Sequence, residues 1–391
     1  MLARAWASQT LATLWVALVS MLLVFVLGRW LGPAGFGQYN YVLTVATLVA
    51  ILQDGGFKTL LQRESASSGL GIDGERLLGF ALGHLLWVTL AALLLVTVLG
   101  RPDSVAIAWA ILALGLLAVA NYLSACWRGQ GHFGRDALWQ VGLRSLTALT
   151  LLLALWLWQA GTEAAFAGWA LGVALALLLV GFRARPQWRP PAAVYRAAGA
   201  FLLIDLATAV YFRIDIVLLR HCGIPDADIG RYAAAYRLFE GGVLLLAPAA
   251  TVFFRELRLR WQDPLALRPV LRRALVGVTL VALLGAMLGF WLAPWVLRLA
   301  YGPGYEAAAP LLGWLLLAFL LVAPNYVLTQ AAVALNRERL YALAVCVAAV
   351  VNIGLNLWLL PQVGVVGAAW ASIGTELCLL LFLAWGVRSW L

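Results

Sequence analysis

The sequence has little charge, one lysine, and few cysteines and histidines. Only 11% of its 391 residues are charged and 64% are hydrophobic, whereas soluble domains are roughly 25% charged and about 45–50% apolar. This shortage of charge excludes a set of soluble domains, although the length alone would allow about two or three. The composition therefore predicts a polytopic membrane protein.

Cysteines and histidines are too few and too dispersed for a disulfide framework, a metal centre or a catalytic nucleophile. The four cysteines form no CxxC pair, and the three histidines lack the spacing of metal ligands. They are Cys126, Cys222, Cys346, Cys378, His84, His132 and His221. The cysteines are expected to be small buried apolar residues. No catalytic residue, metal or cofactor is predicted, and we expect that the chain is not an enzyme.

Apolar runs of roughly 20 residues, the length that crosses a bilayer, recur twelve times. We place them near 9–31, 38–62, 77–99, 104–126, 138–159, 164–182, 197–221, 229–254, 272–300, 308–335, 340–360 and 364–387. Of the 27 basic residues, Lys58 is the one lysine, which leaves 26 arginines. Eighteen arginines fall on one side of these spans and five on the other. The positive-inside rule then places both termini in the cytoplasm.

The two halves of the chain resemble each other. The run Gly37–Tyr39 before the second span matches Gly230–Tyr232 before the eighth, and Asn121-Tyr122 matches Asn325-Tyr326. Each half holds six spans, so both halves keep one orientation and should be related by an axis along the membrane normal.

The predicted fold class is accordingly an all-α membrane protein with twelve transmembrane helices. They form two six-helix bundles, 1–189 and 190–391, related by a pseudo-two-fold axis along the membrane normal. This is the architecture of an alternating-access transporter with its site between the halves.

The stretch 205–240 holds five ionisable residues in otherwise apolar helix, which are Asp205, Arg213, Asp215, Arg237 and Glu240. A charge at membrane depth is costly, so such residues usually face a bundle interior or a water-filled cavity. Arg213 and Asp215 are two positions apart and cannot pair on one helix face, whereas Arg237 and Glu240 are three apart and can. We expect this stretch to line a polar path. The alternative is that these charges lock neighbouring helices together.

Four further ionisable residues inside predicted spans stand out. Asp54 and Lys58 are four apart with the acid first, which favours an intrahelical pair. Arg144 can extend to the interface or contact substrate. Glu376 has no partner nearby in the sequence and is a candidate coupling residue.

Four amides inside predicted spans are candidates for polar contacts. They are Asn325, Gln330, Asn352 and Asn356. Hydrogen bonding between helices is the alternative use of such side chains.

Two long runs resemble a known family. The run LGRWLGPAGFGQYNYVLTVATLVAILQDGGFKTLLQRE (27–64) is similar to the N-terminal signature of the polysaccharide-biosynthesis transport proteins. The run RIDIVLLRHCGIPDADIGRYAAAYRLFE (213–240) is similar to the seventh and eighth helices of that family. These proteins are O-antigen-type flippases of lipid-linked oligosaccharides in the multidrug/oligosaccharidyl-lipid/polysaccharide exporter superfamily.

The resemblance implies a substrate, a location and partners. The substrate would be an oligosaccharide on a polyprenyl pyrophosphate, moved to the outer leaflet of a bacterial inner membrane. Arginine suits pyrophosphate because its planar fork binds two oxygens at once. The partners would be this substrate, membrane lipids and polysaccharide polymerase machinery, with H⁺ or Na⁺ as the coupling ion and no nucleic acid.

Roles follow for the residues above, and the four amides become candidates for hydrogen bonds to sugar hydroxyls. The candidate cations for pyrophosphate are Arg213, Arg237, Lys58 and Arg144, and the coupling or cavity carboxylates are Asp54, Asp205, Asp215, Glu240 and Glu376. A drug exporter of the same superfamily is one alternative, although a cation exporter should favour an acidic and aromatic cavity. A polytopic glycan polymerase or ligase is another, although such enzymes usually need a large outer loop, which this chain lacks.

Overall fold

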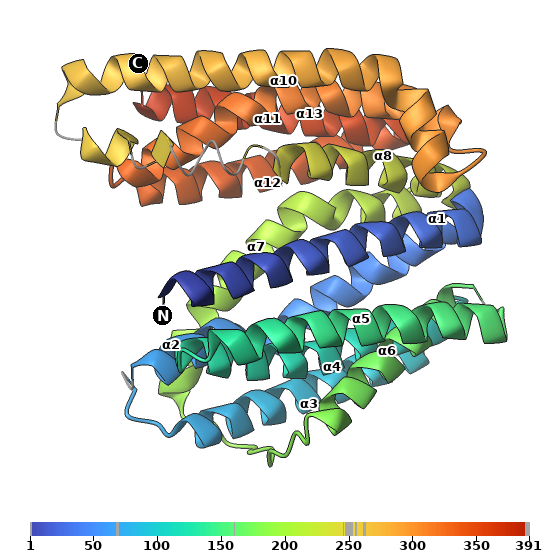
Figure 1. The fold of residues 1–391 in the computed structure, drawn as a ribbon. Helices are drawn as coiled ribbons and strands as arrows, with labels where there is room; N and C mark the ends of the chain where they lie inside the picture. The colour runs from blue at the N-terminus through green and yellow to red at the C-terminus, as the bar shows by residue number, and fades with distance from the viewer. Residues whose placement is uncertain are drawn as a thin grey trace. The chain divides into compact units, whose positions relative to one another are not determined.

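The computed structural model describes residues 2–67, 70–159, 161–244, 246, 253–254, 256–260 and 263–387 (Figure 1). The N-terminal helices are α1 (Leu2–Asp54), α2 (Phe57–Ala66), α3 (Gly74–Leu99), α4 (Ser104–Gly129), α5 (Phe133–Trp158) and α6 (Thr162–Leu179). They are followed by α7 (Ala192–His221), α8 (Asp226–Leu244), α10 (Pro264–Tyr301), the 3₁₀ turn η1 (Glu306–Ala308), α11 (Ala309–Ala334), α12 (Glu338–Val363) and α13 (Val366–Val387).

The predicted all-α membrane fold is confirmed. Among the described residues, nine helices are long and apolar enough to cross a membrane, and no strand occurs. One of the nine, Trp6–Asp54, extends over most of the first two predicted spans. Helices α7 and α8 overlap the seventh and eighth predicted spans but are not among the nine. The end of the eighth span, including 247–252, lies outside the described residues, so the count of twelve stays a prediction.

Helix α1 is interrupted at Gly32, between the first two predicted spans. Gly32 has φ 64° and ψ 177°, and Pro33 follows it. A positive φ is readily adopted only by glycine. The proline has no N–H to donate and restricts the residue before it to extended conformations. The Gly-Pro pair therefore separates α1 into two helical segments.

The predicted second span, 38–62, is wrong as one continuous helix. The chain turns at Gly55 and Gly56, whose φ values are 59° and 80°, and α2 begins at Phe57. A Cβ at Gly56 would lie 2.2 Å from the backbone oxygen of Ala198 on α7. Glycine is thus required here both for its φ and for close backbone approach.

The chain divides into two compact units. Unit 1 comprises Met1–Leu31 and Tyr41–Ala209, and unit 2 comprises Gly32–Asn40 and Val210–Leu391. A short segment of α1 therefore packs with the C-terminal helices, and α7 contributes residues to both units. The domain boundary at residue 189 stays a prediction.

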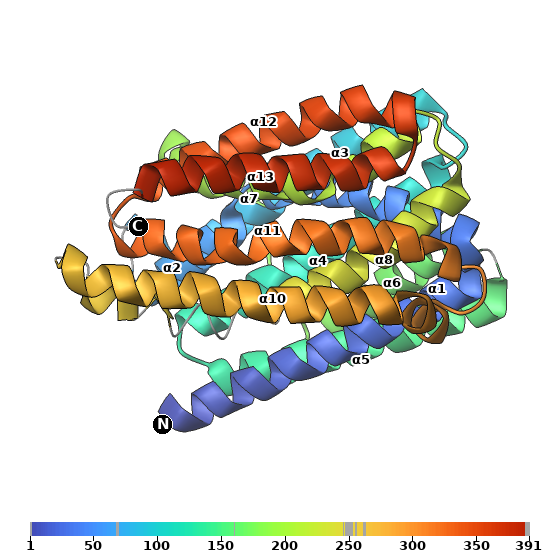
Figure 2. The same cartoon turned by 90° about the horizontal axis from the view of Figure 1, so that it is seen from above.

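Unit 1 is built by close helix packing. Helix α6 packs on α4 and α5, and α4 also contacts α2 and α3 (Figures 1 and 2). Gly168 and Gly172 on α6 allow the contact with α5, because a Cβ at Gly172 would lie 2.2 Å from Thr150 Oγ1. Small residues at such positions let helix backbones approach in membranes, where the apolar lipid gives little hydrophobic drive for association.

In unit 2, α11 packs against α8, α10 and α13, and α12 packs on α13 (Figures 1 and 2). The segment Gly32–Asn40 crosses α8 through two glycines. A Cβ at Gly37 would lie 1.9 Å from the Asp226 backbone oxygen, and one at Gly230 would lie 1.9 Å from that of Pro33. The two backbones are thus in direct contact. Gly37 and Gly230 are also matching positions in the sequence repeat.

We predict that Gly230→Ala destabilises the protein by about 1–3 kcal/mol, the usual cost of overpacking, because its new methyl group meets backbone that has no rotamer to change. Gly241→Ala is the matched control on the same helix, since a Cβ there meets nothing within 4 Å. Thermal unfolding of the detergent-solubilised variants would measure both. Equal unfolding temperatures for the two variants would contradict the direct backbone contact between the segment Gly32–Asn40 and α8.

Candidate functional site

Four charged side chains of unit 2 form a group that we call the α7–α8 charge cluster. It consists of Arg213 and Asp215 on α7 with Arg237 and Glu240 on α8. Both helices carry these charges inside segments that are otherwise largely apolar. The structure thus brings together four of the five charges that stand out between 205 and 240.

Asp215 is fully engaged by hydrogen bonds. Its side chain is buried, one carboxylate oxygen accepts from the backbone N–H of Ile216 at 2.8 Å, and the other accepts from the hydroxyl of Tyr232 on α8. The expectation that Asp215 needs a partner outside its own helix face is met by Tyr232. The carboxylate therefore joins α7 to α8.

Arg237 and Glu240 pair with each other. The guanidinium NH1 lies 2.8 Å from Glu240 Oε2, the geometry expected from their i,i+3 spacing. About a quarter of each side chain is exposed, 24% for Arg237 and 29% for Glu240. The pair is therefore accessible from one side, and it cancels its own charge.

Arg213, like Asp215, forms no ion pair with the described residues, and it is the charge of the cluster that also has no hydrogen bond there. Its guanidinium is partly buried and within electrostatic range of Arg237, Glu240, Tyr236 and Asp215. Within the part of the chain that the structure describes, no side chain forms an ion pair or a hydrogen bond with it. Glu240 is engaged by Arg237 and Asp215 by Tyr232, so the guanidinium of Arg213 keeps its hydrogen-bond donors available, while the four charges of the cluster sum to 2 − 2 = 0.

Glu376 on α13 finds two partners that are distant in the sequence. The hydroxyl of Tyr211 on α7 donates to Oε1, and the amide of Asn325 on α11 donates at 2.8 Å to Oε2. The same amide donates at 2.8 Å to the Glu376 backbone oxygen. Three helices thus converge on one carboxylate, and the Asn325 amide nitrogen is already used within the protein.

The remaining amide candidates lie on α12 and α11. The Asn352 amide donates to Thr375 Oγ1 at 3.3 Å, and the Asn356 amide donates to the Asn352 backbone oxygen at 2.9 Å. Both asparagines are buried. Gln330 is partly buried on α11. The Asn352 contact joins α12 to α13, whereas the Asn356 contact lies within α12.

In unit 1, Asp54 and Lys58 do not form the predicted intrahelical pair, because the glycine turn separates them into α1 and α2. The Asp54 carboxylate instead accepts from the backbone N–H groups of Gly56 at 3.1 Å and Lys58 at 3.3 Å, as a cap of α2. Lys58 and Asp205 remain its electrostatic neighbours. These three charges therefore lie in one region, and Asp205 belongs to a different unit from the α7–α8 charge cluster.

Arg144 lies on α5 beside an aromatic ring. Its guanidinium carbon is 5.9 Å from the ring centroid of Trp169 on α6, at the outer limit of a cation–π contact. This partly buried arginine is thus directed at a helix neighbour within unit 1.

One engaged carboxylate, Asp136, was not predicted. It is completely buried at the start of α5 and accepts from Ser124, from Gln140 at 2.8 Å and from Gln9 at 2.9 Å, with Arg128 Nε at 3.7 Å. The sequence analysis assigned no role to this residue. Its i,i+4 spacing from Gln140 on the same helix was the sequence feature from which their hydrogen bond could have been predicted.

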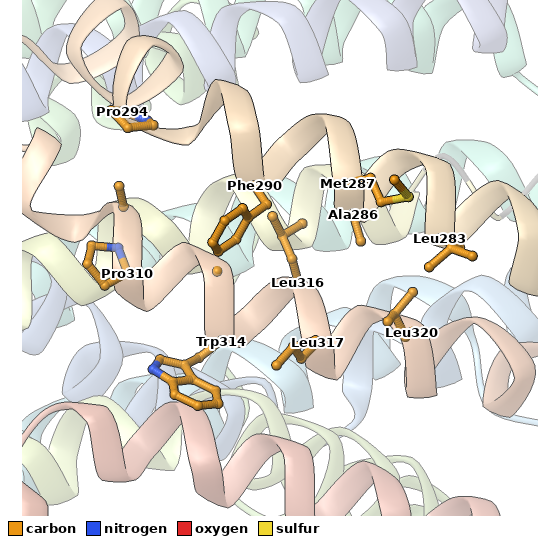
Figure 3. A pocket seen from close by; sticks show the side chains of 12 residues that line it. Leu283, Ala286, Met287, Phe290, Pro294, Pro310, Trp314, Leu316, Leu317 and Leu320 are labelled. Carbon is orange, nitrogen blue, oxygen red and sulfur yellow. The ribbon is translucent and has the colours of Figure 1, made fainter.

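Helices α10 and α11 enclose an apolar groove of about 770 Å³ (Figure 3). Phe290 and Met287 of α10 line it with Trp314, Leu316 and Leu317 of α11. No lining side chain is charged. The groove therefore suits hydrocarbon, and it offers no group to hold a sugar or a pyrophosphate.

Among the described residues, no group of three or more histidine, cysteine, aspartate or glutamate side chains could hold a metal ion. The polar chemistry described above is thus that of arginines, tyrosines, amides and isolated carboxylates.

The chain is similar in structure to several membrane transporters. It matches an inward-facing multidrug resistance MATE family transporter of the MOP superfamily with a TM-score of 0.70 and 14% identity, covering 95% of this chain and 94% of that one. It matches the lipid II flippase MurJ in an inward closed conformation with a TM-score of 0.72 and 13% identity, covering 97% and 87%. A MOP superfamily transporter from Pyrococcus furiosus gives a TM-score of 0.62 and 15% identity over 98% and 94%. At such low sequence identities, these matches establish a similar fold and nothing further.

Comparison of the sequence with known families identifies the family of this chain. A search of curated protein sequences finds no match. The sequence profile of the polysaccharide biosynthesis protein family matches residues 2–254, well over half of the chain. With its apolar helices and the fold of MOP superfamily transporters, the chain is an integral membrane protein that belongs to the polysaccharide biosynthesis protein family.

Proposed function

We propose that this protein is a flippase that moves an oligosaccharide linked to polyprenyl pyrophosphate from the inner to the outer leaflet by alternating access. The membrane would be the bacterial inner membrane, with both termini in the cytoplasm. The family match and the transporter fold support the general class of function. The α7–α8 charge cluster supports an anionic substrate.

The observation that carries this proposal is that the guanidinium of Arg213 has no ion pair or hydrogen bond among the described residues. A pyrophosphate is a dense anion, and its passage across about 30 Å of hydrocarbon needs cationic partners. A guanidinium can donate two parallel hydrogen bonds to phosphate oxygens. Arg213 has no partner among the described residues that would compete for these donors. Arg237 lies within electrostatic range of it and adds charge if Glu240 is displaced.

The same cluster disfavours a cation exporter. A cationic drug would meet Arg213 beside Arg237, and the two carboxylates nearby are already engaged by Tyr232 and Arg237. Bringing a further cation close to these two guanidiniums is unfavourable. An anionic substrate instead finds hydrogen-bond donors on Arg213.

We further propose that the buried carboxylates couple transport to a gradient of H⁺ or Na⁺. Asp215 with Tyr232 and Glu376 with Tyr211 and Asn325 are carboxylates in apolar surroundings, where gain or loss of a cation alters the local charge strongly. Each joins helices, so a change in its charge would alter helix packing. The two halves of the chain would then rock about the site in response.

We predict that Arg213→Ala lowers glycan export on the order of 10- to 100-fold, the size expected for loss of hydrogen bonds to a charged group. Arg213→Lys should keep part of the activity, because it keeps the charge without the bidentate geometry. Translocation of a fluorescent polyprenyl-diphosphate glycan in proteoliposomes would measure it. Arg231→Ala is the control, since that arginine lies 2.8 Å from Asp228 and outside the cluster. Full export by the Ala variant would refute the role of Arg213.

We also predict that Asp215→Asn uncouples transport, because the amide keeps an acceptor for Tyr232 but cannot carry a charge. Translocation by the variant should no longer increase when a proton or sodium gradient is imposed on the proteoliposomes. Asp228→Asn serves as the matched control on α8. If the unsubstituted protein itself were unaffected by collapse of both gradients, the coupling proposal would be wrong.

A further inference from the structure

We propose that a polar pocket at one end of unit 1 binds the phosphate headgroup of an anionic membrane lipid. This pocket, which we call the arginine pocket, has a volume of about 930 Å³. Its charged lining residues are Asp73, Glu75, Arg76, Arg135, Arg183 and Arg185. They come from the start of α3, the start of α5 and the segment after α6, and the end of α4 adds Trp127.

The charge balance of the arginine pocket favours an anion. Four arginines against two carboxylates leave a formal charge of 4 − 2 = +2. Among the described residues, none of these six groups is joined to another charged group by an ion pair. The guanidinium carbon of Arg135 lies 4.3 Å from the centroid of the Trp127 ring, a contact that holds the cation in place. Its planar fork keeps free edges for phosphate oxygens.

The backbone that carries Arg183 and Arg185 is held in place by α3. The N–H of Gln187 donates to the Gly79 backbone oxygen at 2.8 Å. A Cβ at Gly83 would lie 2.1 Å from the Gln187 backbone oxygen. The segment therefore lies directly on the α3 surface, and two glycines of α3 make this possible. The backbone beneath the pocket is thus fixed by the fold, and it presents the exposed arginine side chains together.

The surroundings of the pocket favour a lipid over a soluble anion. Leu178 and Leu179, immediately before lining residue Val180, are 75% and 80% exposed. Trp188, next to lining residue Gln187, packs edge-on against Trp87 of α3 with ring centroids 6.4 Å apart. Exposed leucines at the end of a membrane helix, next to arginines, are typical of the boundary between hydrocarbon and headgroups. A lipid can therefore lay its chains along exposed α6 residues and its phosphate among the arginines.

The side of the membrane follows from the arginine distribution. The ends that form the pocket belong to the arginine-rich side, which the positive-inside rule places in the cytoplasm. The lipid would therefore come from the cytoplasmic leaflet. This inference is independent of the proposed flippase activity, because it uses none of the α7–α8 charge cluster.

Native mass spectrometry of the full chain, titrated with phosphatidylglycerol or with zwitterionic phosphatidylethanolamine, tests the proposal. The double variant Arg183→Gln/Arg185→Gln should weaken phosphatidylglycerol binding on the order of tenfold and leave phosphatidylethanolamine binding unchanged. The control Arg189→Gln/Arg196→Gln removes the same charge from exposed residues of the same stretch that do not line the pocket. It should leave both affinities within about twofold of the unsubstituted protein, since headgroup contacts act at short range.

Removal of a negative charge from the arginine pocket gives a second readout. Glu75→Gln should strengthen phosphatidylglycerol binding severalfold, a gain that a purely structural role would not produce. If the double variant does not fold, Arg135→Gln replaces it with the same expectation. An equal loss in the control would overturn the proposal in favour of a diffuse basic surface. Inorganic pyrophosphate that binds as tightly as phosphatidylglycerol would overturn the choice of a lipid.

Discussion

The cost of charge in an apolar medium is the constraint on which the rest of this structure depends. An ionisable group at membrane depth must be paired, hydrogen-bonded or open to water. Asp215 meets this requirement through Tyr232, and Arg237 meets it through Glu240. Arg213 stands apart, because the described residues supply it with electrostatic neighbours but no ion pair or hydrogen bond. In the proposed flippase this guanidinium meets the anionic substrate, which would connect the packing of α7 and α8 to transport.

The features that could be predicted from the sequence were those that depend on residues close together in the chain. Runs of apolar residues specify helices because in lipid every backbone polar group must be satisfied within the segment, so the all-α class followed from composition and length. The pairing of Arg237 with Glu240 followed from helix periodicity alone. The spacing also predicted that Asp215 needs a partner on another helix face. It did not predict that this partner is Tyr232. Spacing along one helix determines which residues can meet, and it carries no information about the next helix.

What could not be predicted depended on contacts between distant segments. Glu376 and Asn325 are 51 positions apart, and only the packing of α13 on α11 brings them together. The turn at Gly55 and Gly56 was missed for a related reason. Glycine inside an apolar run is tolerated in transmembrane helices, so the break becomes evident only from the close approach of α7 to Gly56. That turn also changed the role of Asp54 from a partner of Lys58 to a helix cap.

The hydrogen bonds of Gln9 have a consequence for biosynthesis. Its amide donates to the backbone oxygen of Phe133 at 2.7 Å and to Asp136 at 2.9 Å, residues that are 124 and 127 positions later in the chain. When the first helix leaves the ribosome, neither acceptor has been synthesised. The amide must then bind water or the insertion machinery until α5 has been inserted. These two contacts of the N-terminal unit can therefore form only after about a third of the chain has been synthesised, so the first helix enters the membrane before its polar partners exist.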